Sequence, residues 1–404
     1  MKIINRPEYL NWLIRWRDQQ IIKVVSGVRR CGKSTLFEIY RDYLLHSGVQ
    51  QNQIITINFE DLRFEQLADY HLLNEYVNKR LLPDKMNYLF LDEVQHCHNF
   101  EKAVDSLFIN KNCDLYLTGS NAYFMFGDLA TLLSGRYVEL KMLPLSFSEF
   151  TNGLDSTRAL LSITEKFNLY LEYGSFPYVL RYNLFGDDDS NYLNDLYNTI
   201  ILKDVVQRLK IQDLNTLDQV TKFMLHNVGN RVTSSKIVNT LKSSGKSTDQ
   251  KTIDKYLNGL TDAMLLYKVS RFNLKGRQYL TTQNKYYTVD TGLRNNLIQT
   301  TQADLGHQLE NLVFLELMRR GSKTYIGQLD NNEIDFVAEK NGNLAYYQVA
   351  TSTLDETTLN RELSPLIKIT DNYPKYLLSL DEIQPNANYS GIIKMNAIDW
   401  LLNK

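Results

Sequence analysis

The alternation of apolar and polar positions divides the first 143 residues into short apolar runs separated by amphipathic or turn-rich stretches. The runs are rich in Val, Ile, Leu and aromatic residues, which is typical of strands buried on both faces of a parallel sheet. Such strands are expected at residues 21–25, 53–61, 87–94, 113–122 and 137–143. The pattern predicts a doubly wound α/β domain that binds its ligand beyond the carboxyl ends of the strands.

The pattern changes after residue 222, where helical spacing is followed by strand-like alternation. Residues 234–244 and 247–265 have helical periodicity, and the second segment opens on a Ser-Thr cap. Residues 265–282 then alternate around Gly276, as expected of a β-hairpin. Two helices and a hairpin in this order predict a winged helix.

The final part of the chain begins with an amphipathic helix at residues 305–321, in which Leu309 and Val313 share one face. A hairpin follows, with strand-like alternation on both sides of an Asn341-Gly342 turn. A further α/β structure is therefore expected after the winged helix.

The loop after the first expected strand contains Gly27, Gly32, Lys33 and Ser34 in the spacing of a phosphate-binding loop. It joins an apolar strand to a helical segment, and its backbone N–H groups are expected to converge on phosphate at the helix N-terminus. We expect Lys33 at the β- and γ-phosphates and Ser34 at Mg²⁺. The candidate nucleotide-binding residues are Gly27, Val28, Arg29, Arg30, Cys31, Gly32, Lys33, Ser34 and Thr35.

A second Gly-Lys-Ser string at residues 245–247 lacks this context. Thr240 stands where the first glycine is required, and residues 234–242 have helical rather than strand-like spacing. We therefore place the nucleotide at the first loop, where the alternative is a chance glycine turn.

Polar residues follow the later strands of the expected sheet. Asp92 can hold Mg²⁺ through water, and Glu93 beside it can orient or deprotonate the attacking water. Ser120 and Asn121 either reach the γ-phosphate or that water, or form a polar turn. Arg136 either serves as an arginine finger for a neighbouring subunit or is a surface residue. These residues predict that the chain binds and hydrolyses a nucleoside triphosphate with Mg²⁺, and an arginine finger at Arg136 would imply a homo-oligomer.

The composition and the remaining motifs exclude several kinds of site and protein. The triplet His96-Cys97-His98 does not predict zinc, because adjacent side chains point apart and no second ligand pair occurs at metal spacing. Cys31, Cys97 and Cys113 are too few for a disulfide framework. The amino terminus lacks the apolar core of a signal peptide, and no apolar run approaches the ~20 residues of a membrane span. A cytoplasmic protein without a membrane partner is expected.

The loop and the segments LFLDEVQ, LTGSNA, LLSGR and LPLSFSEF occur in order. This set resembles prokaryotic AAA+-type ATPases whose carboxyl half is classed as a domain of unknown function. EYGSFPYV at 172–179 is similar to that family's Gly-Gly-Phe-Pro segment, with Ser175 in place of the second glycine, and residues 288–297 and 333–350 are similar to its later signatures. The resemblance spans nearly the whole chain and implies a winged helix followed by a fold similar to restriction endonucleases.

The resemblance also implies a degenerate nuclease site. Glu310 on the expected helix, Asp335 and Gln348 overlay the endonuclease-like arrangement, but catalysis needs a second carboxylate and a lysine where Gln348 and Ala350 stand. Lys340 is the nearest lysine in sequence, and its place at the hairpin tip is expected to keep it away from Asp335. The expected domains are an AAA+-type ATPase at 1–150, a helical linker or lid at 151–215, a winged helix at 216–300 and a catalytically degenerate endonuclease-like domain at 301–404.

Charge is distributed unevenly along the chain. Residues 222–290 contain twelve Lys or Arg and four Asp, a balance of +8 that leaves −9 for the remainder of a chain whose net charge is −1. Such segregation favours a face for double-stranded DNA, with Lys246, Lys251 and Lys255 on or just before the recognition helix. The alternative is a protein-interaction or ATP-gating module with solvated lysines.

Three functions are consistent with these features. The one we expect is Mg²⁺-dependent ATP hydrolysis that switches or remodels a DNA-associated complex. The alternatives are an ATP-gated nuclease and a nucleotide-sensing switch that acts on protein partners. Glu93 favours hydrolysis, the local charge of +8 favours DNA, and the missing lysine opposes nuclease activity.

Overall fold

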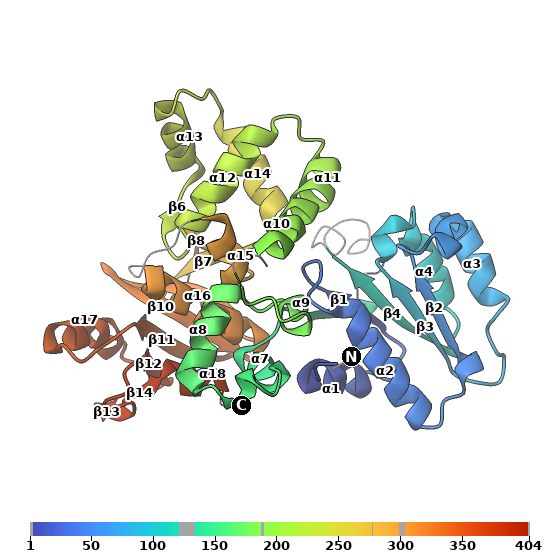
Figure 1. The fold of residues 1–404 in the computed structure, drawn as a ribbon, viewed down its shortest axis with the longest axis horizontal. Helices are drawn as coiled ribbons and strands as arrows, with labels where there is room; N and C mark the ends of the chain where they lie inside the picture. The colour runs from blue at the N-terminus through green and yellow to red at the C-terminus, as the bar shows by residue number, and fades with distance from the viewer. Residues whose placement is uncertain are drawn as a thin grey trace. The chain divides into compact units, whose positions relative to one another are not determined.

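The computed structural model describes residues 3–120, 133, 135–186, 190–276, 278–298 and 304–402. The chain forms two compact units, one built mainly from residues 3–144 and the other mainly from residues 145–404 (Figure 1). Across the described ranges, no helix combines the length and the apolar character needed to cross a membrane.

The first unit contains the expected parallel sheet. Its strands are β1 Ile22–Ser26, β2 Ile54–Asn58, β3 Asn87–Asp92, β4 Cys113–Gly119 and β5 Tyr137–Lys141. They lie in the order β2-β3-β4-β1-β5, and all neighbours are parallel. The sequence prediction of an α/β domain with these five strands is confirmed. Because β4 lies between β1 and β3, the carboxyl ends of these three strands adjoin.

Helices cover both faces of this sheet. They are α1 Pro7–Arg15, α2 Lys33–His46, α3 Tyr70–Asn78 and α4 Phe100–Phe108. Leu89 and Leu91 of β3 share a buried core with α3 and α4. Phe90 between them points to the other face, where its ring lies 5.1 Å from that of Phe37 on α2 and 4.9 Å from that of Tyr116. Burial on both faces explains why the strands read as continuous apolar runs.

The second unit begins with a series of helices. They are α7 Phe147–Gly153, α8 Ile163–Tyr173, α9 Pro177–Arg181, α10 Ser190–Thr199, a π-helical segment at Ile200–Val206, α11 Gln207–Leu209 and α12 Leu214–His226. The start of α8 is set by a capping box in which Ser162 and Glu165 satisfy each other's backbone N–H groups.

Two helices and a hairpin follow, as the sequence predicts. They are α13 Ser234–Ser243, α14 Gln250–Asp262, β7 Leu266–Asn273 and β8 Gln278–Thr288, and a short strand, β6 Arg231–Val232, pairs with β8. The expected Ser-Thr cap of the second helix is wrong, because the helix begins later. The carboxylate of Asp249 accepts a hydrogen bond from the N–H of Thr252 and so takes the capping role.

The hairpin belongs to a larger sheet. After α15 Thr291–Leu297 and α16 Leu305–Arg319 come β9 Lys323–Leu329, β10 Asn332–Lys340, β11 Asn343–Ala350, α17 Glu356–Ile367, β12 Lys375–Ser379, β13 Ala387–Tyr389, β14 Ile392–Asn396 and α18 Ala397–Leu402. The nine strands lie in the order β13-β14-β12-β11-β10-β9-β7-β8-β6. Since β7 pairs with β9, one sheet continues across the boundary expected at residues 300 and 301.

Helices also pack on both faces of this second sheet. Phe314 of α16 lies 4.7 Å from Tyr287 and 6.2 Å from Phe336 between ring centroids. Leu363 and Leu366 of α17 share a buried core with the opposite face of the sheet. The strands that carry the expected endonuclease-like residues are therefore held between these two helices.

Candidate nucleotide-binding site

The phosphate loop is shaped by close backbone packing. Gly32 lies in the left-handed region, with φ 106°, at the position before α2, which begins at Lys33. A Cβ on Gly27 would lie 2.3 Å from the carbonyl oxygen of Met142, so only glycine fits there. The loop therefore turns tightly from β1 into the N-terminus of α2, where backbone N–H groups bind anions well.

The strand order brings the carboxylates of β3 to this loop. The hydroxyl of Thr118 on β4 accepts a hydrogen bond from the N–H of Glu93 at 2.8 Å and donates one to Asp92 Oδ1. Asp92 also interacts with the hydroxyl of Ser34 and accepts a hydrogen bond from Asn58 at 3.3 Å. Ser34 and Asp92, predicted as metal-site residues, are thus brought together.

Lys33 and Glu93 form a buried ion pair. The Lys33 ammonium lies 3.3 Å from Glu93 Oε1 and donates a hydrogen bond to the carbonyl of Gly27 at 3.0 Å. Burial opposes the charge on Glu93, but Lys33, a hydrogen bond from Gln95 and Arg29 outweigh it and lower the pKa of Glu93 to about 2. Burial likewise opposes the charge of Lys33, and the carboxylate of Glu93 is the main reason that its pKa is raised above the ordinary value. Both groups are charged at neutral pH.

Glu93 is held in position by further contacts. Its φ of 52° lies in the left-handed region that non-glycine residues rarely adopt. The Gln95 amide donates to Glu93 Oε2 at 2.6 Å and to the hydroxyl of the buried Ser120 at 3.2 Å. Ser120 therefore belongs to the same network, whereas Asn121 lies outside the described residues.

Arg136 lies apart from this network. Its carbonyl accepts a hydrogen bond from the N–H of Ile22 at the start of β1, whereas the phosphate loop follows the end of that strand. Its guanidinium is half-exposed and forms an ion pair with Asp105. Within its own chain Arg136 thus lies at the amino ends of the strands, whereas Lys33 and Glu93 lie at their carboxyl ends.

The residues at the loop fit a bound Mg²⁺ ion in their chemistry. Ser34 and Asp92 offer a hydroxyl and a carboxylate oxygen, the ligand types that this hard cation prefers. Burial raises the pKa of Asp92, and hydrogen bonds from Thr118 and Ser34 counter that effect only in part. A cation nearby would favour its charged form.

The expected nuclease residues form a separate cluster in the second unit. Glu310 Oε1 accepts hydrogen bonds from the Lys285 ammonium at 2.9 Å and from the Tyr287 hydroxyl at 2.5 Å. Lys285 is buried and also lies 2.8 Å from Glu333. Arg231 donates a second hydrogen bond to Glu333 at 2.6 Å. A lysine from β8 therefore stands among these carboxylates, although sequence reasoning considered only Lys340.

Asp335 and Gln348 complete this cluster. Asp335 Oδ2 accepts a hydrogen bond from the N–H of Val349 at 2.8 Å, and Gln348 donates to Glu362 at 2.9 Å. Burial and the neighbouring Glu310 raise the pKa of Asp335 well above its ordinary value, against the effect of Lys285. Lys340 donates to the carbonyl of Arg320 at 2.6 Å.

The basic residues between 222 and 290 divide into two groups. Several neutralise carboxylates of the sheet and its surroundings, in the ion pairs Lys222–Asp218, Arg231–Glu333, Lys275–Asp330 and Lys285–Glu310. Lys251 and Lys255 are exposed one turn apart on α14, and Lys246 is half-exposed in the segment before that helix. The charge of +8 is therefore not one continuous surface.

Sequence reasoning missed three residues that the structure places at these sites. Thr118 interrupts an apolar strand with a hydroxyl two residues before Ser120, and Gln95 follows Glu93 by two residues. Lys285 is a charge within the long β8 strand, whose neighbours are apolar or uncharged. A polar residue inside a buried strand was the available signal in two of the three cases.

Two stretches of the chain match families defined by sequence. Residues 19–151 match a family described as an AAA domain. Residues 164–304 match a family described as a domain of unknown function. The first unit is therefore an AAA-type P-loop ATPase domain.

Two proteins are similar over most of their length. One, described as an uncharacterized protein of Haemophilus influenzae, is 38% identical over 403 residues, which cover 99% of each chain. The other, described as an uncharacterized protein of Methanocaldococcus jannaschii, is 30% identical over 356 residues, which cover 85% of this chain and 77% of that one. A solved structure of a Walker-type ATPase of Pyrococcus abyssi is 16% identical, with a TM-score of 0.49, and the similarity covers 73% of this chain and 96% of that one.

Proposed function

This chain belongs to the same family as its Haemophilus and Methanocaldococcus relatives and contains an AAA domain. We propose that it hydrolyses ATP to switch or remodel a DNA-associated complex. One observation supports the proposal that the chain hydrolyses ATP. Glu93 is ionised and held by Thr118 and Gln95 at the end of β3, 3.3 Å from the lysine of the phosphate loop. This position places a charged carboxylate beside the loop that is expected to hold the phosphates.

Each residue of the site has one chemical task in this proposal. Lys33 and the backbone N–H groups of residues 28–34 bind the phosphates. Glu93 accepts a proton from the attacking water or orients it, and its low pKa keeps it unprotonated at neutral pH. Mg²⁺, when bound, neutralises phosphate charge, and the Ser34 hydroxyl and Asp92 carboxylate are the groups that would hold it. Ser120 and Gln95 keep Glu93 oriented.

The exposed lysines of the helix pair support the DNA part of the proposal. Lys251 and Lys255 extend from one side of α14, and Lys236 and Lys242 are exposed on α13. Lysines grouped in this way bind phosphates of a duplex without reading its sequence. In this proposal, the affinity of the helix pair for DNA depends on whether the ATPase domain has ATP or ADP bound.

The test is the ATPase rate of the full chain with and without double-stranded DNA at low salt. We expect hydrolysis that is stimulated by the duplex and absent in Lys33→Ala. An ATPase rate that is the same with and without DNA would favour the switch that acts on protein partners. A chain that binds ATP but does not hydrolyse it under any of these conditions would contradict the proposal.

A further inference from the structure

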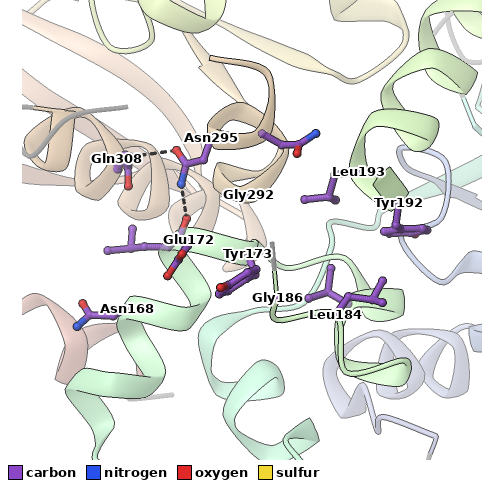
Figure 2. Close-up of a pocket in the computed structure, with 13 residues that line it drawn as sticks. Asn168, Glu172, Tyr173, Leu184, Gly186, Tyr192, Leu193, Gly292, Asn295 and Gln308 are labelled. Carbon is purple, nitrogen blue, oxygen red and sulfur yellow. Dashed lines mark hydrogen bonds between the residues drawn. The ribbon is translucent and has the colours of Figure 1, made fainter. Parts of the chain in front are cut away.

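The second unit contains a cavity of about 520 Å³ that has no part in the nucleotide site. Two segments noted in the sequence, residues 172–179 and 288–297, supply much of its wall, and Gln308 of α16 closes one side (Figure 2). Tyr192 and Leu193 of α10 stand on the other side. The volume is in the range of sites that hold a small molecule or a single side chain.

The two segments are locked together by close contacts. The carboxylate of Asp290 accepts hydrogen bonds from the N–H and the hydroxyl of Ser175, both at 2.6 Å. A Cβ on Gly292 would lie 2.2 Å from the carbonyl carbon of Tyr173. Both glycines at this junction, Gly174 and Gly292, are therefore required by packing. These contacts hold the two segments of the wall against each other.

The lining has the chemistry of a cation site. Among the described residues that line it, none is Lys, Arg or His, and Glu172 is a carboxylate at its exposed side. Tyr173 and Tyr192 offer aromatic rings, which attract cations through their faces. Gln308 donates one N–H of its amide to Asn295 at 3.1 Å, and its carbonyl oxygen is an acceptor that a cationic ligand can use. An anionic group such as a phosphate would meet no positive side chain among the described residues of the lining.

A further polar group points to a ligand with an acceptor. Asn296 lines the cavity, and within the described part of the chain its amide nitrogen is buried and has no hydrogen-bond partner. A buried donor without a partner is unfavourable, so an acceptor on the ligand would gain that interaction. A peptide carbonyl is such an acceptor, whereas a simple amine has none.

We propose that this cavity binds an aliphatic chain that ends in a guanidinium or ammonium group. Leu171, Val179 and Leu184 contact the methylene stem, and Glu172 and the tyrosine rings bind the cation. Two sources share this chemistry, a basic side chain of a partner protein and a free small amine. The unpaired Asn296 amide favours the peptide, which carries the carbonyl that it lacks.

The experiment is saturation-transfer NMR of the full chain with N-acetyl-Gly-Arg-Gly-amide, with agmatine and with N-acetyl-Gly-Glu-Gly-amide. We expect both cations to bind, the peptide more tightly than agmatine, and the acidic peptide not to bind. Glu172→Gln should weaken binding about fivefold because one exposed charge pair is lost. Leu184→Trp, at the half-buried rim, should fill the entrance and abolish binding.

Asp195→Asn is the matched control, because it removes an exposed carboxylate of α10 that does not line the cavity. It should leave binding unchanged. Tighter binding of agmatine than of the arginine peptide would identify a free amine as the source. Equal signals from the acidic and basic peptides, no signal at millimolar concentration, or an unchanged affinity in both Glu172→Gln and Leu184→Trp would overturn the proposal.

Discussion

Lys33 and Glu93 are ion-paired in one buried site, yet their proposed tasks differ. Lys33→Ala removes a charge that binds phosphate, so nucleotide binding should be lost. Glu93→Gln keeps the shape of the side chain but cannot accept a proton, so ATP should still bind while hydrolysis slows at least ~100-fold. Equilibrium binding of a fluorescent ATP analogue and a steady-state phosphate assay measure the two effects. Equal loss of binding in both variants would contradict the role of Glu93 in water activation.

The low pKa of Glu93 makes a prediction about pH. A carboxylate whose pKa in the folded chain is about 2, below its ordinary value of 4.5, contributes stability that is complete above pH 4.5 and is lost as the pH falls towards 2. The difference in free energy of unfolding between wild type and Glu93→Gln should therefore be constant from pH 7 to pH 5 and shrink below pH 4.5. Urea denaturation at pH 7, 5 and 4 measures it. A difference that stays constant down to pH 4 would place the pKa near its ordinary value, and a difference that grows in favour of wild type as the pH falls from 7 to 5 would place it above that value.

Residues next to a motif in sequence were predictable, and residues that meet it through folding were not. Asp92 and Glu93 follow an apolar strand, so their place at the sheet edge could be predicted from the strand itself. The contact of Thr118 with Asp92 depends on β4 lying beside β3, which sequence spacing does not specify. Lys285 meets Glu310 for the same reason, because β8 and α16 are joined by packing rather than by sequence proximity.

At the scale of elements, local patterns predicted the kinds of element but not all of their partners. The hairpin of β7 and β8 was predicted from alternation around Gly276, and it forms. Its second pairing, parallel to β9, is non-local and joins the hairpin to the strands that follow α16. Turn chemistry and alternation determine a hairpin, whereas a parallel pairing is set by the helices that connect the strands. Strands from both sides of the expected boundary therefore belong to one sheet.

The prediction for the elements concerns DNA binding by the exposed lysines of α14. Lys251→Glu with Lys255→Glu should weaken binding to every duplex by a similar factor and flatten the salt dependence, because these side chains are expected at phosphates. Fluorescence anisotropy with two unrelated duplexes at several salt concentrations measures both effects. Lys203→Glu with Lys323→Glu changes the net charge equally at exposed positions elsewhere and should have a smaller effect. If wild type binds no duplex at low salt, the helix pair belongs to the protein-interaction function.

At the scale of the whole molecule, Arg136 is the residue whose role depends on a second copy. Arg136 lies at the amino ends of the strands, and the phosphate loop lies at their carboxyl ends. Arg136 therefore cannot reach the nucleotide bound by its own chain. If it acts across a subunit boundary, Arg136→Ala should lower turnover by a factor on the order of 10³ and leave ATP affinity unchanged. Steady-state kinetics and sedimentation at the assay concentration test it together. Full activity from a strict monomer would make Arg136 a surface residue paired with Asp105.

The last prediction concerns the carboxylate cluster of the second unit. A nuclease of the endonuclease-like type needs carboxylates that hold Mg²⁺ and a lysine that orients the attacking water. Lys285 is present, but its ammonium is already paired with Glu310 and Glu333, and Tyr287 occupies the same oxygen of Glu310. The Lys285 ammonium therefore neutralises the carboxylate charge that would otherwise attract a metal ion.

The remaining ligands are also weak. The raised pKa of Asp335 favours its neutral form, and a neutral carboxyl binds a hard cation poorly. Gln348 is a neutral amide engaged with Glu362. We therefore expect no cleavage when the purified chain is incubated with supercoiled plasmid, ATP and Mg²⁺ or Mn²⁺, although the same preparation hydrolyses ATP. Cleavage that disappears in both Asp335→Ala and Lys285→Met would show that Lys285 replaces the missing lysine, and the ATP-gated nuclease would then become the preferred function.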